Sequence, residues 1–216
     1  MLFSREGAGA GYERLVVIER AQLGLRAIVA VHSTRRGPAF GGIRRRVYGS
    51  EAEALADALA LAEAMSHKCA LAGLPAGGAK TVVLRPASGP EPDWDAAYAA
   101  LGAEIAAMHG AYVCGPDLGT GDAELAALRR TCSFVNPAGN DAGLSTAAGV
   151  HAGLRAVWRA IERPATGPRT VAIQGLGAVG RALAAMLRDE GVEVVGADVE
   201  PEACRVAAGL GVHIVS

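Results

Sequence analysis

The chain has 216 residues, of which 51% are hydrophobic and 20% charged, a balance typical of one large or two small globular domains and not of a disordered chain. Its formal net charge of -1 provides no basic field for nucleic acid or an anionic membrane surface, so we expect small-molecule partners. No apolar stretch resembles a secretion signal or is long enough to span a bilayer, and the four cysteines form no CxxC pair. The sequence therefore predicts a cytoplasmic protein without a disulfide framework or a metal site.

Hydrophobic periodicity predicts strands that alternate with helices along the chain. In chain order, the predicted elements are a hairpin over 14–20 and 25–32, a helix over 50–67, a strand over 80–84, a helix over 93–109, a short strand over 112–114, a helix over 146–162, a strand over 170–173, a helix over 181–189, a strand over 192–197, a helix from Pro201 and an apolar end over 212–216. The segment 163–169, rich in proline and glycine, is the one linker-like change in composition. This alternation predicts an α/β fold.

Glycine is about twice as frequent as in an average protein, with 29 residues. The glycines cluster at 41–42, 73–78, 115–121 and 175–180, between the periodic segments. Clusters of this kind mark places where the backbone turns sharply or approaches a ligand closely. We therefore look for function at these four places.

Gly175, Gly177 and Gly180 form a G-x-G-x-x-G motif that follows a predicted strand and opens a predicted helix. In this context the glycines allow a tight turn, close approach of the backbone to a pyrophosphate, and close packing of helix on strand. Asp198 ends the next strand, near the spacing at which a carboxylate binds the adenine ribose, and Glu200 beside it would repel a 2′-phosphate. The motif favours NAD over NADP; the alternative is a glycine turn in an ordinary α/β unit with a solvated Asp198.

Lys68 and Lys80 flank the second glycine cluster, and Asp117 lies in the third. A lysine near apolar surface can have a lowered pKa and act as a base, and a neighbouring carboxylate can relay a proton. Each of these residues is by itself more often a surface charge, and spacing in sequence does not show whether they meet.

The segments GPAFGGIR, AEAMSHKCALAGLPAGGAKTVV, GPDLGT and IQGLGAVG, in this order, resemble the Glu/Leu/Phe/Val amino-acid dehydrogenase family, and its leucine dehydrogenases most. The resemblance runs from about Tyr12 to the end of the chain. It implies NAD-dependent oxidative deamination of an amino acid to the 2-oxo acid and ammonia, a reversible reaction. It also implies a homo-oligomer, which agrees with a hairpin at 14–32 whose strands could pair across subunits.

The resemblance assigns Lys80 as the catalytic lysine that activates water, Asp117 as its proton-transfer partner and Lys68 as the partner of the substrate carboxylate. The remaining residues implied for substrate or cofactor binding are Phe40, Gly41, Gly42 and Met65 for the substrate, and Thr146, Gly175, Leu176, Gly177, Ala178, Val179, Gly180 and Asp198 for the cofactor. Phe40 stands where glutamate-type members of the family carry a charge, so an apolar amino acid of the leucine, valine or phenylalanine type is expected.

The resemblance divides the chain into a substrate-binding and oligomerisation domain with a mixed sheet, residues 1–136, and an incomplete NAD-binding Rossmann domain, residues 137–216. Family members run well beyond the second strand of their nucleotide domain, so the strand at 170–173 is expected at an exposed sheet edge. We expect this chain alone to be marginally stable in its C-terminal part and a weak catalyst; the alternative function is an inactive NAD-binding or oligomerisation module. Arg44, Arg45 and Arg46 are expected at a solvated edge or a subunit contact.

Overall fold

A computed structural model describes residues 11–139, 141–161 and 169–215 of the chain. The chain divides into two compact units, Met1–Ala138 and Gly139–Ser216, each with its own core. The predicted linker at 163–169 lies outside the described residues except for Arg169, as does residue 162 at the end of the predicted helix. No helix in the described part of the chain is both long and apolar enough to cross a membrane.

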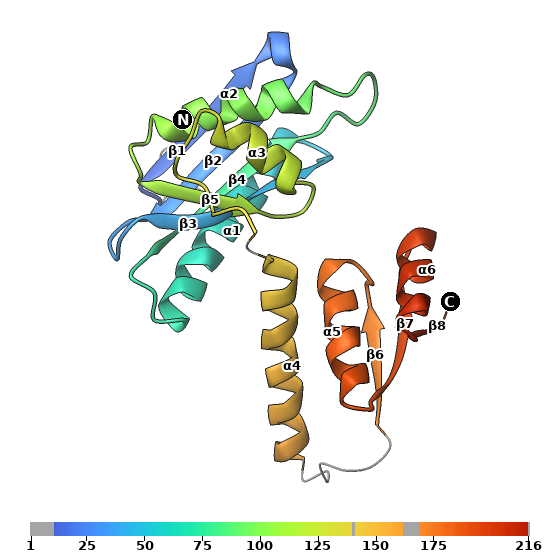
Figure 1. Ribbon diagram of the computed structural model, residues 1–216. Helices are drawn as coiled ribbons and strands as arrows, with labels where there is room; N and C mark the ends of the chain where they lie inside the picture. The colour runs from blue at the N-terminus through green and yellow to red at the C-terminus, as the bar shows by residue number, and fades with distance from the viewer. Residues whose placement is uncertain (1–10, 140, 162–168, 216) are drawn as a thin grey trace. The chain divides into compact units, whose positions relative to one another are not determined.

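The first unit is built on a five-stranded mixed sheet in the order β1-β2-β4-β3-β5 (Figure 1). Its strands are β1 (Arg14–Arg20), β2 (Leu25–Ser33), β3 (Ala39–Arg46), β4 (Gly77–Leu84) and β5 (Tyr112–Pro116). The pairs β1–β2 and β2–β4 are antiparallel, whereas β3 is parallel to both β4 and β5. The predicted hairpin and the predicted mixed sheet are confirmed.

Helices cover both faces of this sheet (Figure 1). The helix α1 (Glu51–Leu71) packs on one face against Ile28, Ala30 and Val82, and α2 (Trp94–Ala106) and α3 (Asp122–Arg129) cover the other. The predicted N-cap of α1 is confirmed, because the Ser50 hydroxyl accepts a hydrogen bond from the Glu53 amide at 3.1 Å. The helix runs four residues beyond its predicted end at His67, to Leu71.

Neither β3 nor α3 was predicted, and β4 begins three residues before its predicted start. For β3 and β4 the reason is that their glycines were expected to form loops. The structure makes Gly77 and Gly78 part of β4. A Cβ on Gly78 would lie 2.1 Å from the amide nitrogen of Ser66 in α1, so glycine lets the helix backbone approach the strand closely. Here glycine permits close packing within regular structure, and no turn is present.

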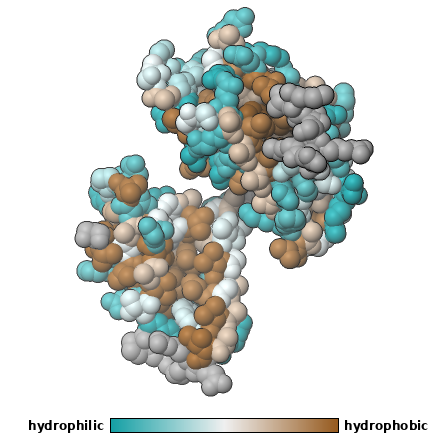
Figure 2. Space-filling model, turned by 180° about the vertical axis from the view of Figure 1, so that it is seen from behind, coloured by the Kyte–Doolittle hydropathy of each residue, from teal (hydrophilic) through white to brown (hydrophobic). Residues whose placement is uncertain are grey.

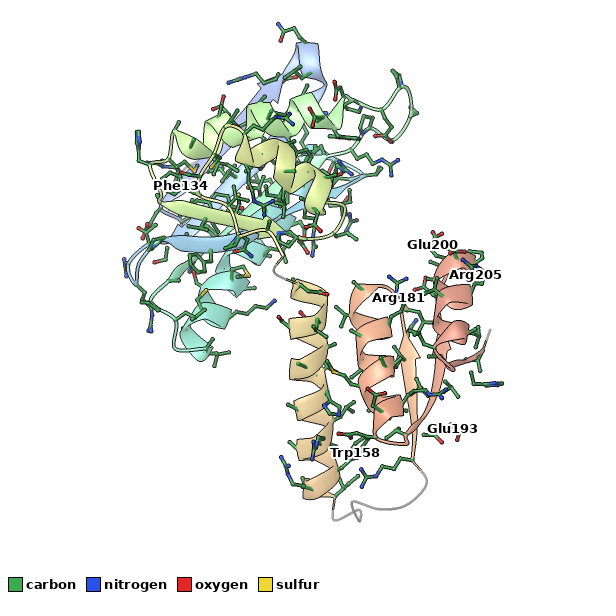
Figure 3. The ribbon with its side chains drawn as sticks, in the orientation of Figure 1. Phe134, Trp158, Arg181, Glu193, Glu200 and Arg205 are labelled. Atoms are coloured by element: carbon green, nitrogen blue, oxygen red, sulfur yellow. The ribbon has the colours of Figure 1, made fainter. Side chains whose placement is uncertain are left out.

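The second unit contains α4 (Ala142–Ala160), β6 (Thr170–Gln174), α5 (Ala178–Asp189), β7 (Glu193–Ala197), α6 (Pro201–Gly209) and β8 (His213–Ile214). Its three strands are all parallel, in the order β6-β7-β8, which places β6 at an edge of the described sheet, as expected. The helix α4 packs beside α5, and Trp158 of α4 joins the core of the unit (Figure 3). The strand–helix alternation predicted for this segment is confirmed.

Part of the surface of the second unit is apolar (Figure 2). The exposed large apolar side chains on α4 are Leu144, Val150 and Val157, and Val199 between β7 and α6 is 94% exposed. No element among the described residues of the second unit covers these side chains.

Candidate functional site

Buried Lys80 and partly buried Asp117 form an ion pair on the α1 side of the first sheet. Lys80 lies in the middle of β4, between β2 and β3, and is 5% exposed. Asp117 directly follows β5, and β3 lies between β5 and β4 in the sheet. The Lys80 Nζ atom lies 2.5 Å from Asp117 Oδ2. The structure thus brings together two residues that are separated in sequence by α2 and β5.

The surroundings of this pair shift both pKa values downward. Burial lowers the pKa of the Lys80 amine, and repulsion by Arg44 and Lys68 adds to this, while the hydrogen bond to Asp117 raises it in part. Burial by itself raises the pKa of the Asp117 carboxyl, but the hydrogen bond and charge of Lys80 outweigh it, and the net pKa is below its usual value. Asp117 is therefore ionised at neutral pH, and Lys80 releases its proton more readily than a surface lysine does.

Arg44 is a second cationic partner of Asp117, which the sequence analysis missed. Its Nε lies 3.0 Å from Asp117 Oδ2, and its Nη1 lies 3.3 Å from a carboxylate oxygen of Asp57 in α1. The Tyr48 hydroxyl donates a hydrogen bond to the same carboxylate at 2.7 Å. The interpretation of the three arginines as a solvated edge is therefore wrong for Arg44.

That interpretation is also wrong for Arg45, which points to the opposite face of the sheet. Its guanidinium stacks 4.4 Å from the centroid of the Trp94 ring in α2 and pairs with Glu124 of α3 at 3.0 Å. Arg46 alone of the three lies in solvent, where it pairs with Glu53. The signal that could have separated them is the two-residue period of a strand, which puts Arg44 on the same face as Gly42.

The residues implied for substrate binding lie around this pair in the first unit. Gly42 leaves room for Asp117, because a Cβ at this position would lie 2.9 Å from the Asp117 Cβ. Phe40 pairs in register with Gly78, over which α1 passes, and its side chain is 38% exposed. Lys68 in the last turn of α1 is exposed and is close enough to Lys80 to lower its pKa.

Two other residues implied for substrate binding, Gly41 and Met65, also lie in the first unit. The Gly41 carbonyl accepts a hydrogen bond from the Tyr112 hydroxyl at 3.2 Å, inside the sheet. Met65 lies in α1 and is half-buried.

The low lysine content of the sequence is a further signal for this site. Only two of its 21 lysine and arginine residues are lysines, and these two are Lys68 and Lys80. Arginine serves wherever the chain needs a fixed positive charge, since its guanidinium does not lose its proton in proteins. A side chain with a primary amine occurs only at these two positions, and Lys80 is the one of the two whose pKa is lowered, as proton transfer near neutral pH requires.

The glycine motif of the second unit forms a tight turn between β6 and α5. Gly175 has a φ of 93°, which favours glycine, and a Cβ on Gly180 would lie 2.0 Å from the Gly175 carbonyl oxygen. Gly177 caps the N-terminus of α5, and a Cβ there would meet no protein atom within 4 Å. The turn therefore exposes backbone amides beside open space at a helix N-terminus, which suits a phosphate group.

The larger side chains inside the motif face the core, so a ligand would contact mainly its backbone. Leu176 is fully buried, and Val179 packs against the core of the unit. Ala178 lies against Gly143 of α4, since a Cβ on that glycine would come within 3.0 Å of the Ala178 Cβ.

Asp198 follows β7 and is tied to the glycine turn. Its Oδ2 accepts a hydrogen bond from the Leu176 amide at 2.6 Å, and its Oδ1 accepts one from the Glu200 amide at 2.9 Å. These backbone hydrogen bonds, the one from Glu200 first, lower the pKa of the Asp198 carboxyl. Arg181 of α5 and Glu200 lie at the same end of the unit (Figure 3). A carboxylate oxygen has two lone pairs, so Asp198 can still accept hydrogen bonds from a ligand hydroxyl.

Thr146 lies on the exposed surface of α4, and its hydroxyl donates to the Ala142 carbonyl at 2.6 Å. Within the described residues, no group of three or more histidine, cysteine, aspartate or glutamate side chains could hold a metal ion.

We expect Asp117→Asn to lower the free energy of unfolding by roughly 1–3 kcal/mol at neutral pH, because Arg44 and Lys80 lose a charged partner in a half-buried site. This difference in unfolding free energy is fully present above pH 3.8, the ordinary pKa of an aspartate. It should disappear as the pH falls below 3.8 and past the lower pKa of Asp117 in the folded protein, because the wild-type carboxyl then becomes protonated too. Urea unfolding followed by circular dichroism on both sides of this pH measures the difference.

The matched control is Asp95→Asn, which removes a carboxylate paired with Arg130 on the surface. Solvent screens that pair, so its loss should be smaller. An equal loss in the two variants, or a difference for Asp117→Asn that does not depend on pH, would contradict the assignment of Asp117 as a stabilising buried carboxylate.

Comparison with known proteins places these features in a family. The family model for the Glu/Leu/Phe/Val dehydrogenase dimerisation domain matches residues 16–134. The valine dehydrogenase of Streptomyces coelicolor is 39% identical over 206 residues, covering 90% of this chain and 55% of that protein. The leucine dehydrogenase of Geobacillus stearothermophilus is 36% identical over 203 residues, covering 88% of this chain and 53% of that protein.

Among solved structures, the L-tryptophan dehydrogenase of Nostoc punctiforme superposes with a TM-score of 0.66 at 29% identity, over 95% of this chain and 59% of that one. The chain thus spans a little over half the length of the relatives that it matches. The family model covers more than half of the chain and includes both Lys80 and Asp117. The chain belongs to the Glu/Leu/Phe/Val dehydrogenase family.

Proposed function

We propose that the protein catalyses the reversible, NAD-dependent oxidative deamination of an apolar L-amino acid to the 2-oxo acid and ammonia. The observation that carries this proposal is the buried Lys80–Asp117 pair, an amine with a lowered pKa held 2.5 Å from an ionised carboxylate. The relatives named above, which act on valine, leucine and tryptophan by their names, support the reaction class.

The chemistry needs a group that takes a proton from water. NAD, when bound, would supply the oxidant that removes a hydride from the Cα of the neutral substrate amine and leaves a protonated imine. Lys80, in its neutral form, then accepts a proton from the water whose oxygen bonds to the imine carbon. Lys80 passes this proton to the substrate nitrogen, and Asp117 can relay it. The C–N bond then breaks, ammonia leaves, and the hydroxyl proton returns to Lys80 as the C=O bond forms.

Lys68 is proposed to bind the substrate carboxylate. It is exposed, it lies close enough to Lys80 to affect its pKa, and it is the one other primary amine among the side chains. A lysine is a compact point charge that suits a carboxylate without needing two fixed hydrogen bonds. The carboxylate would thereby hold the substrate Cα near the Lys80 amine.

An apolar substrate side chain is favoured by the groups that line this face of the sheet. Phe40 presents a partly exposed ring, and Met65 lies on the turn of α1 that passes over Gly78, the residue paired with Phe40. Phe40 brings no charge that would bind a second carboxylate, as a glutamate substrate would require.

The second unit fits NAD, on the evidence of its glycine turn. The space beside Gly177 and the amides at the start of α5 would hold the pyrophosphate, and Asp198 would accept hydrogen bonds from the adenine ribose hydroxyls. The carboxylates of Asp198, Glu200 and Glu202 would repel a 2′-phosphate, which favours NAD over NADP. Thr146 is assigned to the cofactor by family resemblance alone.

We propose that the first unit forms homo-oligomers through β1, which pairs only with β2 within the described residues and exposes 74% of Val17. The matched family model is described as a dimerisation domain.

Val17→Lys should then lower the mass measured by light scattering after gel filtration. Leu71→Lys, which changes an exposed leucine at the end of α1, should leave the mass unchanged; an unchanged mass in Val17→Lys would remove β1 from the interface.

The main test of the proposed function is NADH formation from a panel of L-amino acids by the protein that carries this chain. Leucine, valine and phenylalanine should be oxidised and glutamate should not, because Phe40 offers no charge to its side chain. Lys80→Met should lower kcat by about 10²–10⁴-fold, since a general base is lost. Lys68→Met, the same change at the other lysine, should mainly raise KM.

No NADH from any member of the panel would contradict the proposed function. Normal kcat in Lys80→Met would remove Lys80 from its role as the base, and an unchanged KM in Lys68→Met would remove Lys68 from binding the carboxylate.

Gly177→Val should weaken NAD binding by about tenfold or more, which corresponds to about 1.4 kcal/mol, without lowering the melting temperature. The side chain would meet no protein atom but would fill the space assigned to the pyrophosphate. Isothermal titration calorimetry with NAD measures the affinity. The control Gly209→Val, at the end of α6 and also free of nearby atoms, should bind NAD as wild type does. Unchanged affinity in Gly177→Val would exclude the turn as the NAD site.

A further inference from the structure

Two cations share one oxygen of the Asp117 carboxylate. Lys80 Nζ lies 2.5 Å from Oδ2, and Arg44 Nε lies 3.0 Å from the same atom. The two cationic side chains therefore compete for one acceptor and repel each other at close range. Of the two, only Lys80 can relieve this repulsion by releasing a proton, because a guanidinium stays charged at every pH at which the protein is folded.

Arg44 is held in this position from a second side. Its Nη1 lies 3.3 Å from Asp57, which also accepts a hydrogen bond from the Tyr48 hydroxyl at 2.7 Å. Desolvation and the Asp57 carboxylate raise the pKa of this hydroxyl, which keeps Tyr48 a hydrogen-bond donor. Arg44 thus bridges the loop after β5 to α1, and its side chain is 23% exposed.

The guanidinium group suits this bridge because its nitrogens point in fixed directions and can bind two carboxylates at once. A lysine at the same place would reach one carboxylate and could itself lose its proton. Arg44 therefore supplies a charge that is both fixed in place and fixed in value.

The charged and titratable groups on this side of the sheet come from each element packed around Lys80. They include Tyr12 before β1, His32 on β2, Arg44 and Arg46 on β3, Glu53, Asp57 and Lys68 on α1, Tyr48 before α1, and Asp117 after β5. His32 is hydrogen-bonded to Ser66 of α1 at 2.8 Å, and Arg46 lies outside in solvent. Besides Lys80, Arg44 is the one cation of this set that directly contacts Asp117.

We propose that Arg44 is a positioning residue that holds Asp117 ionised and drives Lys80 towards its neutral form. The value of this role rests on the proposed function, in which neutral Lys80 takes a proton from water. Arg44 touches neither water nor substrate in this scheme, and it acts through the carboxylate that it shares with Lys80.

The lysine content of the chain makes a direct test possible. A chain labelled with lysine carrying ¹³C at Cε gives two side-chain signals, because Lys68 and Lys80 are its only lysines, and Lys80→Met assigns them. The pH titration of the Lys80 signal reports when its amine loses a proton. In Arg44→Gln the midpoint should rise by about 1 pH unit, since Lys80 loses a repelling charge and gains sole use of Asp117.

The matched control is Arg46→Gln, which removes the same charge from the same strand and the same face. Its Lys80 midpoint should stay at the wild-type value. In Arg44→Lys, which retains the positive charge, the Lys80 midpoint should lie closer to the wild-type value than to that of Arg44→Gln. Circular dichroism checks folding, and Arg44→Met replaces Arg44→Gln if the glutamine variant does not fold. An unchanged midpoint in a folded Arg44 variant, or an equal rise in Arg46→Gln, would overturn the proposal.

This titration requires no turnover. A protein that fails to oxidise amino acids would still show whether Arg44 controls Lys80, so failure of the proposed function and failure of this inference are separate results. Where the enzyme is active, the same effect should appear in the pH profile of kcat/KM. The acidic limb of this profile, where Lys80 becomes protonated, should move to higher pH in Arg44→Gln but not in Arg46→Gln.

Discussion

The amino group of Lys80 lies in the middle of a sheet, where an unpaired charge would be costly, and the surrounding structure is arranged to give it a partner. Asp117 must therefore come to β4 from the end of β5, across β3. Gly42 allows this because any side chain at its position would collide with Asp117. The loop that carries Asp117 is tied to the sheet by the Arg45 amide, which donates to the Leu118 carbonyl at 2.8 Å.

The same loop is held from the opposite face of the sheet. Arg45 reaches Trp94 and Glu124 there, and the Tyr98 hydroxyl lies 2.5 Å from the Thr120 hydroxyl, three residues after Asp117. The position of the Asp117 carboxylate thus depends on contacts made by α2 and α3, which lie on the other face from Lys80. The Lys80–Asp117 pair on one face is thus positioned in part by polar and aromatic contacts on the other.

Much of this architecture could be predicted from the sequence, and the failures have a common physical cause. The hairpin, the N-cap at Ser50 and the strand–helix alternation after Arg169 depend on local patterns, which a sequence displays directly. The strand β3 was missed because its glycines serve close packing, which is a tertiary property. Lys80 and Asp117 were assigned by resemblance, since no local pattern shows that a residue of β4 meets one that follows β5.

Arg44 was misjudged for the same reason. Three consecutive arginines suggest a solvated surface, whereas a strand directs neighbouring side chains to opposite faces. Here Arg44 meets a carboxylate on one face, and Arg45 stacks on an aromatic ring on the other. The scarcity of lysine was visible in the sequence and would have marked Lys68 and Lys80 without any knowledge of the fold.

The alternation along β3 has a consequence for how this segment can change during evolution. Inserting or deleting a single residue between Gly42 and Arg45 would reverse the direction of every side chain that follows it. The guanidinium that now stacks on Trp94 would then face Asp117, and the one that bridges Asp57 would enter the apolar core. Point substitutions can be absorbed one at a time, but a length change here would disturb the electrostatics of one face and the packing of the other together. The length of β3 should therefore be under stronger constraint than the identity of most of its residues.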